Sequence, residues 1–120
     1  MWFRSKRIEN KDWEVMNNDV VTLTNGRRME EALLAGKELY EVSKNSFGKQ
    51  HKHTVTALNN LGIIYTLREE FAEAESYLLA ALQISERASG EISREVALVN
   101  MNLANLYGYK AKKIMALIEK

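Results

Sequence analysis

Cysteine and proline are both absent from this 120-residue chain. Without cysteine the chain has no disulfide or thiolate chemistry, and it suits a reducing compartment. Without proline no residue forces a helix to break, so helix ends are expected mainly at the few glycines. Gly48 and Gly90 are the expected helix-ending positions. Both absences favour long helices.

An excess of one charge and long hydrophobic runs are missing as well. The 17 basic and 16 acidic residues give a formal net charge of +1, which creates no global field for nucleic acid or an anionic membrane. No apolar run approaches the ~20 residues that span a bilayer, and residues 1–7 lack the apolar stretch of a secretory signal. We expect a cytoplasmic protein that binds neither nucleic acid nor membrane.

The groups of side chains that metal sites and catalysis require are also missing. His51 and His53 flank Lys52, but two imidazoles without a carboxylate or thiolate partner leave a divalent ion underligated. The chain has no Ser/His/Asp arrangement and no phosphate-binding glycine loop, and capping of a helix start explains the acidic cluster between Glu69 and Glu75 better than catalysis does. We therefore expect no metal, no cofactor and no enzymatic activity.

What the chain does have is an internal repeat with a 42-residue period. Aligned with itself at this offset, it pairs identical residues along most of its length: Asn17-Asn18 with Asn59-Asn60, Asn60 with Asn102, Thr24 with Thr66, Leu61 with Leu103, Tyr65 with Tyr107, Glu31-Ala32 with Glu73-Ala74, Ser43 with Ser85 and Gly48 with Gly90. One constant offset over most of a chain indicates duplication of a structural unit.

Each unit is predicted to be a pair of helices. The second helices, starting near Met29 and Phe71, carry apolar or small residues at i, i+3, i+6, i+7, i+10 and i+11, which is one helical stripe. The first helix of unit two runs from about Thr54 through Leu67 and contains Gly62. Glycine inside a helix costs about 1 kcal/mol relative to alanine, so Gly62 and the equivalent Ala104 indicate places where two helices approach closely.

The stripe of unit two resembles the tetratricopeptide consensus of large, large, Gly/Ala, Tyr, Ala, Phe and Ala, which falls on Leu58, Leu61, Gly62, Tyr65, Ala74, Leu78 and Ala81. The 42-residue period is similar to the longer repeat variety of kinesin light chains and many bacterial relatives, as is the segment from Gly48 to Tyr65. The resemblance covers about residues 12–108. It departs at Lys52 and Arg94, where the family usually has proline, and at Asp19 and Val20, which occupy a large and a small apolar position.

This resemblance implies an all-α fold, an α-α superhelix of stacked antiparallel helix hairpins with about five to six helices. We expect one domain over residues 11–120, with units at about 12–48, 54–90 and 96–120. Residues 1–10 are predicted to be an N-terminal leader, whose aromatic and basic segment from Trp2 to Arg7 is either flexible or an aromatic lid on the first hairpin.

Two alternatives remain open for the incomplete third unit. It is either one long helix or a hairpin whose turn has lost two residues. The shortened hairpin aligns Ala111, Ile114, Leu117 and Ile118 with Phe71, Ala74, Tyr77 and Leu78.

The resemblance also implies a scaffold that binds a protein or peptide, with the first helix of each hairpin lining a concave groove. The groove positions of the family, carried over to this chain, are Asn17, Asn18 and Val21, then Asn59, Asn60, Ile63 and Thr66, then Met101, Asn102, Asn105 and Tyr109. Asparagine offers both a donor and an acceptor to the backbone of an extended peptide. The competing interpretation is a structural ladder of asparagines. Leu98 and Asn102 stand where chaperone-binding members have cations, which argues against a carboxylate clamp.

An alternative function follows from the incomplete last unit. An apolar helix end without a cover in its own chain tends to bind another chain. We therefore predict, as the alternative, a self-assembly module that forms a homodimer through Ile114, Leu117 and Ile118. In the competing arrangement these residues fold back onto the second hairpin.

Overall fold

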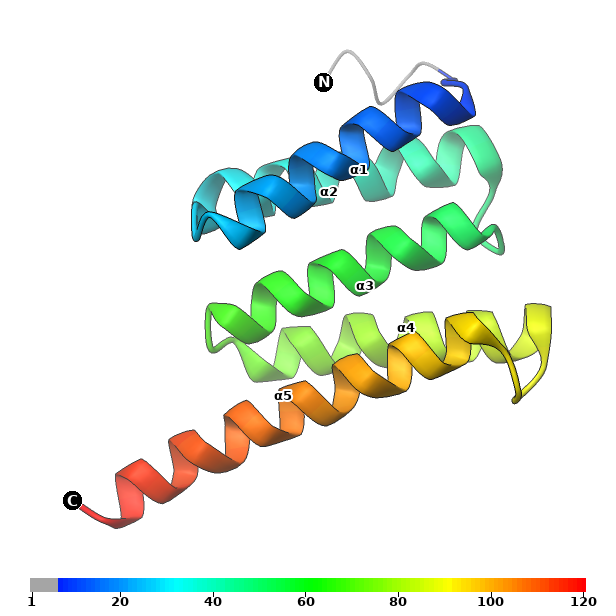
Figure 1. The fold of residues 1–120 in the computed structure, drawn as a ribbon. Coiled ribbons are helices and arrows are strands. Elements are labelled where there is room, and N and C mark those ends of the chain that lie inside the picture. The colour runs from blue at the N-terminus through cyan, green and yellow to red at the C-terminus, as the bar shows by residue number, and fades with distance from the viewer. Residues whose placement is uncertain (1–6) are drawn as a thin grey trace.

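The computed structural model describes residues 7–120, which form five α-helices and no strand (Figure 1). The helices are α1 (Asn10–Asn25), α2 (Met29–Phe47), α3 (Lys52–Leu67), α4 (Phe71–Ser89) and α5 (Arg94–Ile118). Helices α1–α2 and α3–α4 are antiparallel hairpins, and α5 packs against α3 and α4. Helices α1, α3 and α5 form one layer, and α2 and α4 form the other. The predicted all-α array of stacked hairpins is confirmed, with five helices.

Most of the predicted leader lies outside the described residues, including the aromatic and basic segment from Trp2 to Lys6. The described part of the leader contacts the first hairpin: the backbone N–H of Ile8 donates to Ser46 Oγ at 2.9 Å, and Ile8 packs on the core between α1, α2 and α3. No helix within residues 7–120 has both the length and the apolar character needed to cross a membrane.

The 42-residue period is present in the backbone geometry. Arg27 and Glu69, in the turns after α1 and α3, both adopt the left-handed region, with φ values of 61° and 62°. The next N–H in each turn donates to the carbonyl five residues earlier, as in Glu70 to Tyr65. Gly48 and Gly90 end α2 and α4 with φ values of 93° and 78°, which confirms the predicted helix-ending glycines.

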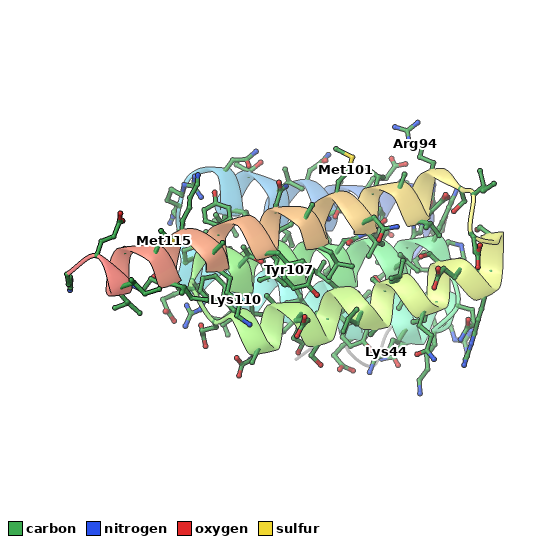
Figure 2. All side chains as sticks on the ribbon, turned by 90° about the horizontal axis from the view of Figure 1, so that it is seen from below. Lys44, Arg94, Met101, Tyr107, Lys110 and Met115 are labelled. Carbon is green, nitrogen blue, oxygen red and sulfur yellow. The ribbon has the colours of Figure 1, made fainter. Side chains whose placement is uncertain are left out.

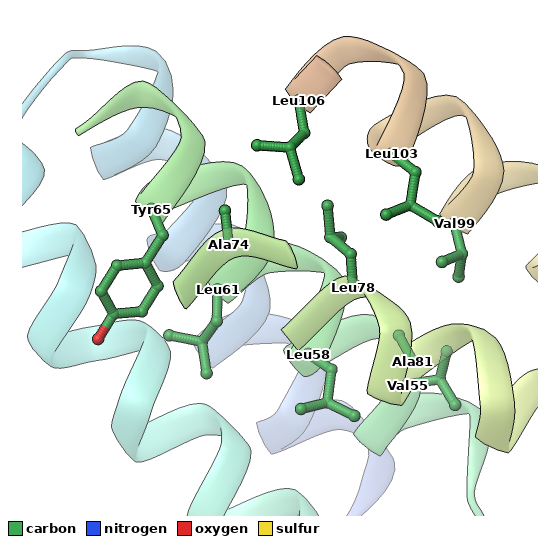
Figure 3. Packing of buried hydrophobic residues seen from close by; sticks show 10 residues of the cluster. All are labelled: Val55, Leu58, Leu61, Tyr65, Ala74, Leu78, Ala81, Val99, Leu103 and Leu106. Carbon is green, nitrogen blue, oxygen red and sulfur yellow. The ribbon is translucent and has the colours of Figure 1, made fainter. Parts of the chain in front are cut away.

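The core fills the space between the two layers in two connected clusters. One cluster joins α1, α2 and α3 around Trp13, Leu39 and Ile64. The other joins α3, α4 and α5 (Figure 3) and contains Val55, Leu58, Leu61, Tyr65, Ala74, Leu78, Ala81, Val99, Leu103 and Leu106. Every inward-facing stripe predicted from the repeat contributes to these clusters, so each hairpin is stabilised by packing against its neighbour.

Gly62 lies at the closest approach of α3 and α4. A Cβ atom added there would lie 2.3 Å from Leu78 Cδ2, far inside van der Waals contact. The predicted close approach at Gly62 is therefore confirmed. The equivalent Ala104 is exposed instead, because no helix within residues 7–120 covers that side of α5.

The outer side of α1 is polar for a similar reason. Asp19, which replaces a large apolar residue of the repeat, is exposed, and none of the described helices covers that side of α1. Val20 is buried in the core between α1 and α2. The departure from the repeat at Asp19 thus suits the end of an array, whose outer face meets water.

Helix α5 is one continuous helix of 25 residues, whereas α1 and α3 have 16. Of the two alternatives for the third unit, the structure has the long helix. Lys113 stands where α4 has Phe71, so the apolar stripe is lost at the 42-residue offset, and the chain continues as one helix through Ile118. Lys113 pairs with Glu69 at 3.1 Å instead, and all residues from 107 to 120 are exposed as α5 runs past the array (Figure 2).

The acidic cluster after α3 binds side chains instead of capping α4. Glu70 is the N-cap residue of α4 but makes no side-chain capping hydrogen bond, and its carboxylate pairs with Arg68. Arg68 also pairs with Glu30 of α2 at 2.7 Å. Glu75 accepts a hydrogen bond from the Tyr107 hydroxyl at 2.5 Å. The expected capping role is wrong for Glu70, and the cluster joins neighbouring helices.

Candidate functional site

The predicted groove asparagines form two hydrogen-bonded pairs between neighbouring helices. Asn60 Nδ2 donates to Asn17 Oδ1 at 2.6 Å, which joins α3 to α1. Asn102 Nδ2 donates to Asn59 Oδ1 at 3.1 Å, which joins α5 to α3. The two bonds are related by the 42-residue repeat, so the duplication reproduces a contact between units as well as the units themselves.

The ends of this asparagine ladder fall on Asn18 and Met101. Asn18 is exposed at the outer edge of α1, where none of the described helices lies beside its amide. Met101 holds the position of Asn17 and Asn59, is 62% exposed, and points away from the array (Figure 2). Among the described helices, none lies beyond α5 to donate to an amide at Met101. The ladder therefore has a structural role, and each pair still leaves amide hydrogens and lone pairs for a ligand.

Two hollows lie between the helices of the α1–α3–α5 layer, toward the C-terminal ends of these helices. The hollow between α3 and α5 measures about 130 Å³ and is lined by Ile63, Thr66, Leu67, Asn102, Asn105 and Tyr109. The hollow between α1 and α3 measures about 70 Å³ and is lined by Val21, Thr24, Asn25, Asn60 and Ile63. Ile63 lines both hollows, so the structure brings together most of the groove residues expected from the sequence.

A third hollow of about 330 Å³ lies on the same layer near the first turns of α3 and α5. It is lined by Trp13, Asn17, Lys52, His53, Thr56, Arg94, Glu95 and Leu98. Sequence reasoning missed this part of the face. The repeat contained a usable signal, because Lys52 and Arg94 are one repeat period apart, as are Thr56 and Leu98. Positions that recur at the repeat period on the first helices lie along one face of the array.

The two histidines near the third hollow lie at the start of α3, where His51 caps the helix and His53 contacts α1. His51 is the N-cap of α3, and its Nδ1 accepts from the backbone N–H of His53 at 2.9 Å. The His53 ring stacks on Trp13, with 3.9 Å between ring centroids, and its Nε2 contacts Asn10 Oδ1. Across residues 7–120, no three His, Asp or Glu side chains gather into a potential metal site.

Stability is expected to fall as pH decreases below about 6.5, the ordinary pKa of histidine. Burial lowers the pKa of His53, and the nearby His51 and Lys52 charges lower it further. Burial also lowers the pKa of His51. The unfolded chain then takes up protons that the folded chain does not, so the neutral rings stabilise the fold above this pH and the benefit is lost below it.

Melting temperatures measured by circular dichroism at about pH 7.5 and pH 5.5 test this expectation. The acid sample should melt at the lower temperature, and His53→Gln should reduce the difference between the two. Equal melting temperatures for the native sequence at both values would contradict the expectation.

Comparison with known proteins agrees with this architecture. A tetratricopeptide repeat family model matches residues 22–87 and again residues 53–117. The chain is also 29% identical over 70 residues to the Drosophila melanogaster protein named Tetratricopeptide repeat protein 19 homolog, mitochondrial. That match covers 58% of this chain and 19% of the relative, so the chain spans about a fifth of the relative's length. The two model matches take in every helix from α2 to α5, and the chain belongs to the tetratricopeptide repeat family.

Proposed function

We propose that this chain is a protein-interaction scaffold that binds an extended peptide segment along the α1–α3–α5 face. Tetratricopeptide repeats generally mediate protein–protein interactions, which gives the class of partner. The observation that carries the proposal is the hollow between α3 and α5. There the apolar side chains of Ile63 and Leu67 and the Tyr109 ring lie beside the amides of Asn102 and Asn105. A few polar groups around an apolar floor are typical of a binding site.

The arrangement indicates how a peptide would lie. An apolar peptide side chain would enter the hollow at Ile63, while the Asn105 amide would bond to the peptide backbone. The peptide would then cross the asparagine pairs toward the third hollow. The exposed Lys52 and Arg94 lie there at the starts of two helices, where positive potential favours an acidic side chain.

Alanine substitutions at Asn105 and Tyr109 test the groove. Both residues are exposed and neither belongs to the asparagine pairs, so the fold should tolerate their loss. A peptide selected on the native chain from a random peptide library should bind each variant about tenfold more weakly, which corresponds to about 1.4 kcal/mol. Titration calorimetry measures the affinity, and circular dichroism checks that the helices are intact.

Leu34→Ala provides the matched control, because Leu34 is an exposed apolar residue on α2, in the other layer. This variant should bind the selected peptide with unchanged affinity. If peptides bind well to both groove variants and poorly to Leu34→Ala, the binding face is the α2–α4 layer and the groove mechanism is wrong.

Three finer predictions accompany this function. The 42-residue spacing of the left-handed turns supports the longer repeat variety that is similar to kinesin light chains. A cytoplasmic location stays a prediction, as does the absence of nucleic-acid and membrane partners. The D. melanogaster relative is named as a mitochondrial protein.

A further inference from the structure

An apolar stripe along α5 is left uncovered by the described part of the chain. Its residues alternate spacings of three and four, and they are Ala104, Tyr107, Ala111, Ile114 and Ile118. The exposed fractions are 45% for Tyr107, 47% for Ile114 and 71% for Ile118. Alternating spacings of three and four place side chains along the seam where two helices pack as a coiled coil.

The second hairpin of the same molecule, α3–α4, indicates what kind of element covers such a stripe. On α3, Gly62 is covered by Leu78 of the antiparallel α4, and Tyr65 stacks on Tyr77 with 5.4 Å between ring centroids. Ala104 and Tyr107 hold the positions of Gly62 and Tyr65 in the next repeat unit. Helix α5 therefore presents the face that receives an antiparallel second helix in the preceding unit.

The second half of α5 has the sequence pattern of such a covering helix. When Ala111 is aligned with Phe71 of α4, Ile114, Leu117 and Ile118 fall on Ala74, Tyr77 and Leu78. One continuous helix thus contains both a receiving face and a covering stripe. The helix is straight enough to project past α4 (Figures 1 and 2), so its own covering stripe cannot reach its own receiving face.

We propose that two copies of this chain pair through antiparallel α5 helices, each copy covering the α5 face that the described residues of the other leave exposed. The two helices would pack in the same register as α3 and α4, where Leu78 covers Gly62. Ile118 of one copy, which aligns with Leu78, then packs on Ala104 of the other, which aligns with Gly62. The two-fold axis then passes beside Ala111, midway between these residues. In this register Ile114 falls opposite Gly108 of the second copy, and Tyr107 falls opposite Met115. Leu117 lies outside this spacing.

Charge placement agrees with this pairing. Lys110, Lys112 and Lys113 lie off the stripe, and Lys113 is engaged by Glu69 of its own chain. The stripe itself is therefore apolar, with Lys112 and Lys113 on the far side of the helix and Lys110 at its margin. A symmetric contact that uses the same patch on both copies closes after two chains.

At the opposite end of the array, the described outer surface of α1 carries charged and polar side chains around Val15. On α1, the positions one repeat period before the α2-facing residues of α3 are Lys11, Val15, Asp19 and Thr22, and all four are exposed. Stacking the α5 end of one copy on this surface would bury charged groups without partners. Head-to-tail filaments are therefore disfavoured relative to the pairing of two α5 ends.

Cysteine cross-linking tests the register directly, because the chain contains no cysteine of its own. Ala111→Cys places two thiols across the two-fold axis, and mild oxidation with copper phenanthroline should link most of the protein as dimers. Ala116→Cys is the matched control, since residue 116 is exposed but lies about 140° around the helix from residue 111. Equal linkage at both positions would overturn the proposed register.

Sedimentation equilibrium tests the pairing itself. The native chain should be a dimer, and Ile118→Lys should raise the dissociation constant at least tenfold, whereas Ala116→Lys should leave it unchanged. Both side chains are exposed in the single copy, so both variants should stay helical by circular dichroism. A native chain that remains monomeric at high concentration would overturn the proposal. Because the groove lies on another face, Ile118→Lys should still bind the selected peptide, and Asn105→Ala should still dimerise.

Discussion

Replacing Leu78 with alanine is expected to lower the free energy of unfolding by about 2–5 kcal/mol. Leu78 is fully buried in the cluster shared by α3, α4 and α5, and its side chain occupies the space left by the missing Cβ of Gly62. Truncation removes apolar contacts with three helices at once and leaves a cavity that the close-packed helices cannot fill. Urea unfolding followed by circular dichroism measures the loss.

Gly62→Ala gives the complementary test. Alanine has the better helix propensity by about 1 kcal/mol, but its Cβ would lie 2.4 Å from Leu78 Cγ, and overpacking costs about 1–3 kcal/mol. The single variant should therefore be less stable than the native chain. In the Gly62→Ala/Leu78→Ala double variant the new methyl group fills part of the cavity, so the combined loss should be smaller than the sum of the two. Simple additivity would contradict the close contact between these residues.

Trp13→Ala is expected to cost about 3–5 kcal/mol and to loosen α1 before the rest of the array. Trp13 is buried, stacks on His53 of α3, and donates from Nε1 to Ser43 Oγ of α2 at 2.8 Å. One side chain thus joins three helices, and α2 and α3 are the described helices that α1 contacts. Native-state hydrogen exchange should show faster exchange in α1 than in α3 and α4.

Two further variants separate the ring from its hydrogen bond. Trp13→Phe keeps an aromatic ring against His53 and loses the bond to Ser43, so it should cost about 1 kcal/mol beyond the lost area. Val15→Ala changes an exposed residue of α1 and should stay within about 0.5 kcal/mol of the native chain. If Trp13→Ala accelerated exchange equally in all helices, α1 would be part of a single cooperative unit.

Helix α1 also matters for the proposed binding face. Trp13 and Asn17 line the third hollow, and Val21 lines the hollow between α1 and α3. A variant that loosens α1 should therefore lose the hollows on that side while keeping the one between α3 and α5, which α1 does not line. Stability of the first hairpin and the length of the binding face are coupled through Trp13.

Much of the architecture could be predicted from the sequence. The 42-residue offset located both complete hairpins, and the structure repeats it in the turns at Arg27 and Glu69. Gly48 and Gly90 marked helix ends, and Gly62 marked a close approach, because each needs a backbone or a space that other residues do not fit. The family resemblance also predicted which layer carries the candidate site, because it assigns the groove to the first helix of each hairpin.

The tertiary structure decided three features that the residues alone left open. The asparagines pair across helices because neighbouring units are displaced so that Asn60 meets Asn17, and this displacement depends on core packing. The third hollow forms where Lys52 and Arg94 line the same edge, although they belong to different repeat units of the chain.

The last of these features is the length of α5. Arg27 and Glu69 turn the chain in a left-handed conformation that costs a non-glycine residue about 1–2 kcal/mol, and the apolar helix that follows each turn offsets this cost by packing back on the core. At the equivalent Ala111 the chain stays helical through Ile118, and Lys113 stands where Phe71 begins α4. Of these three equivalent positions, the chain therefore turns at Arg27 and Glu69 and continues as a helix at Ala111. Local sequence determined the repeat, and long-range packing determined where the repeat stops.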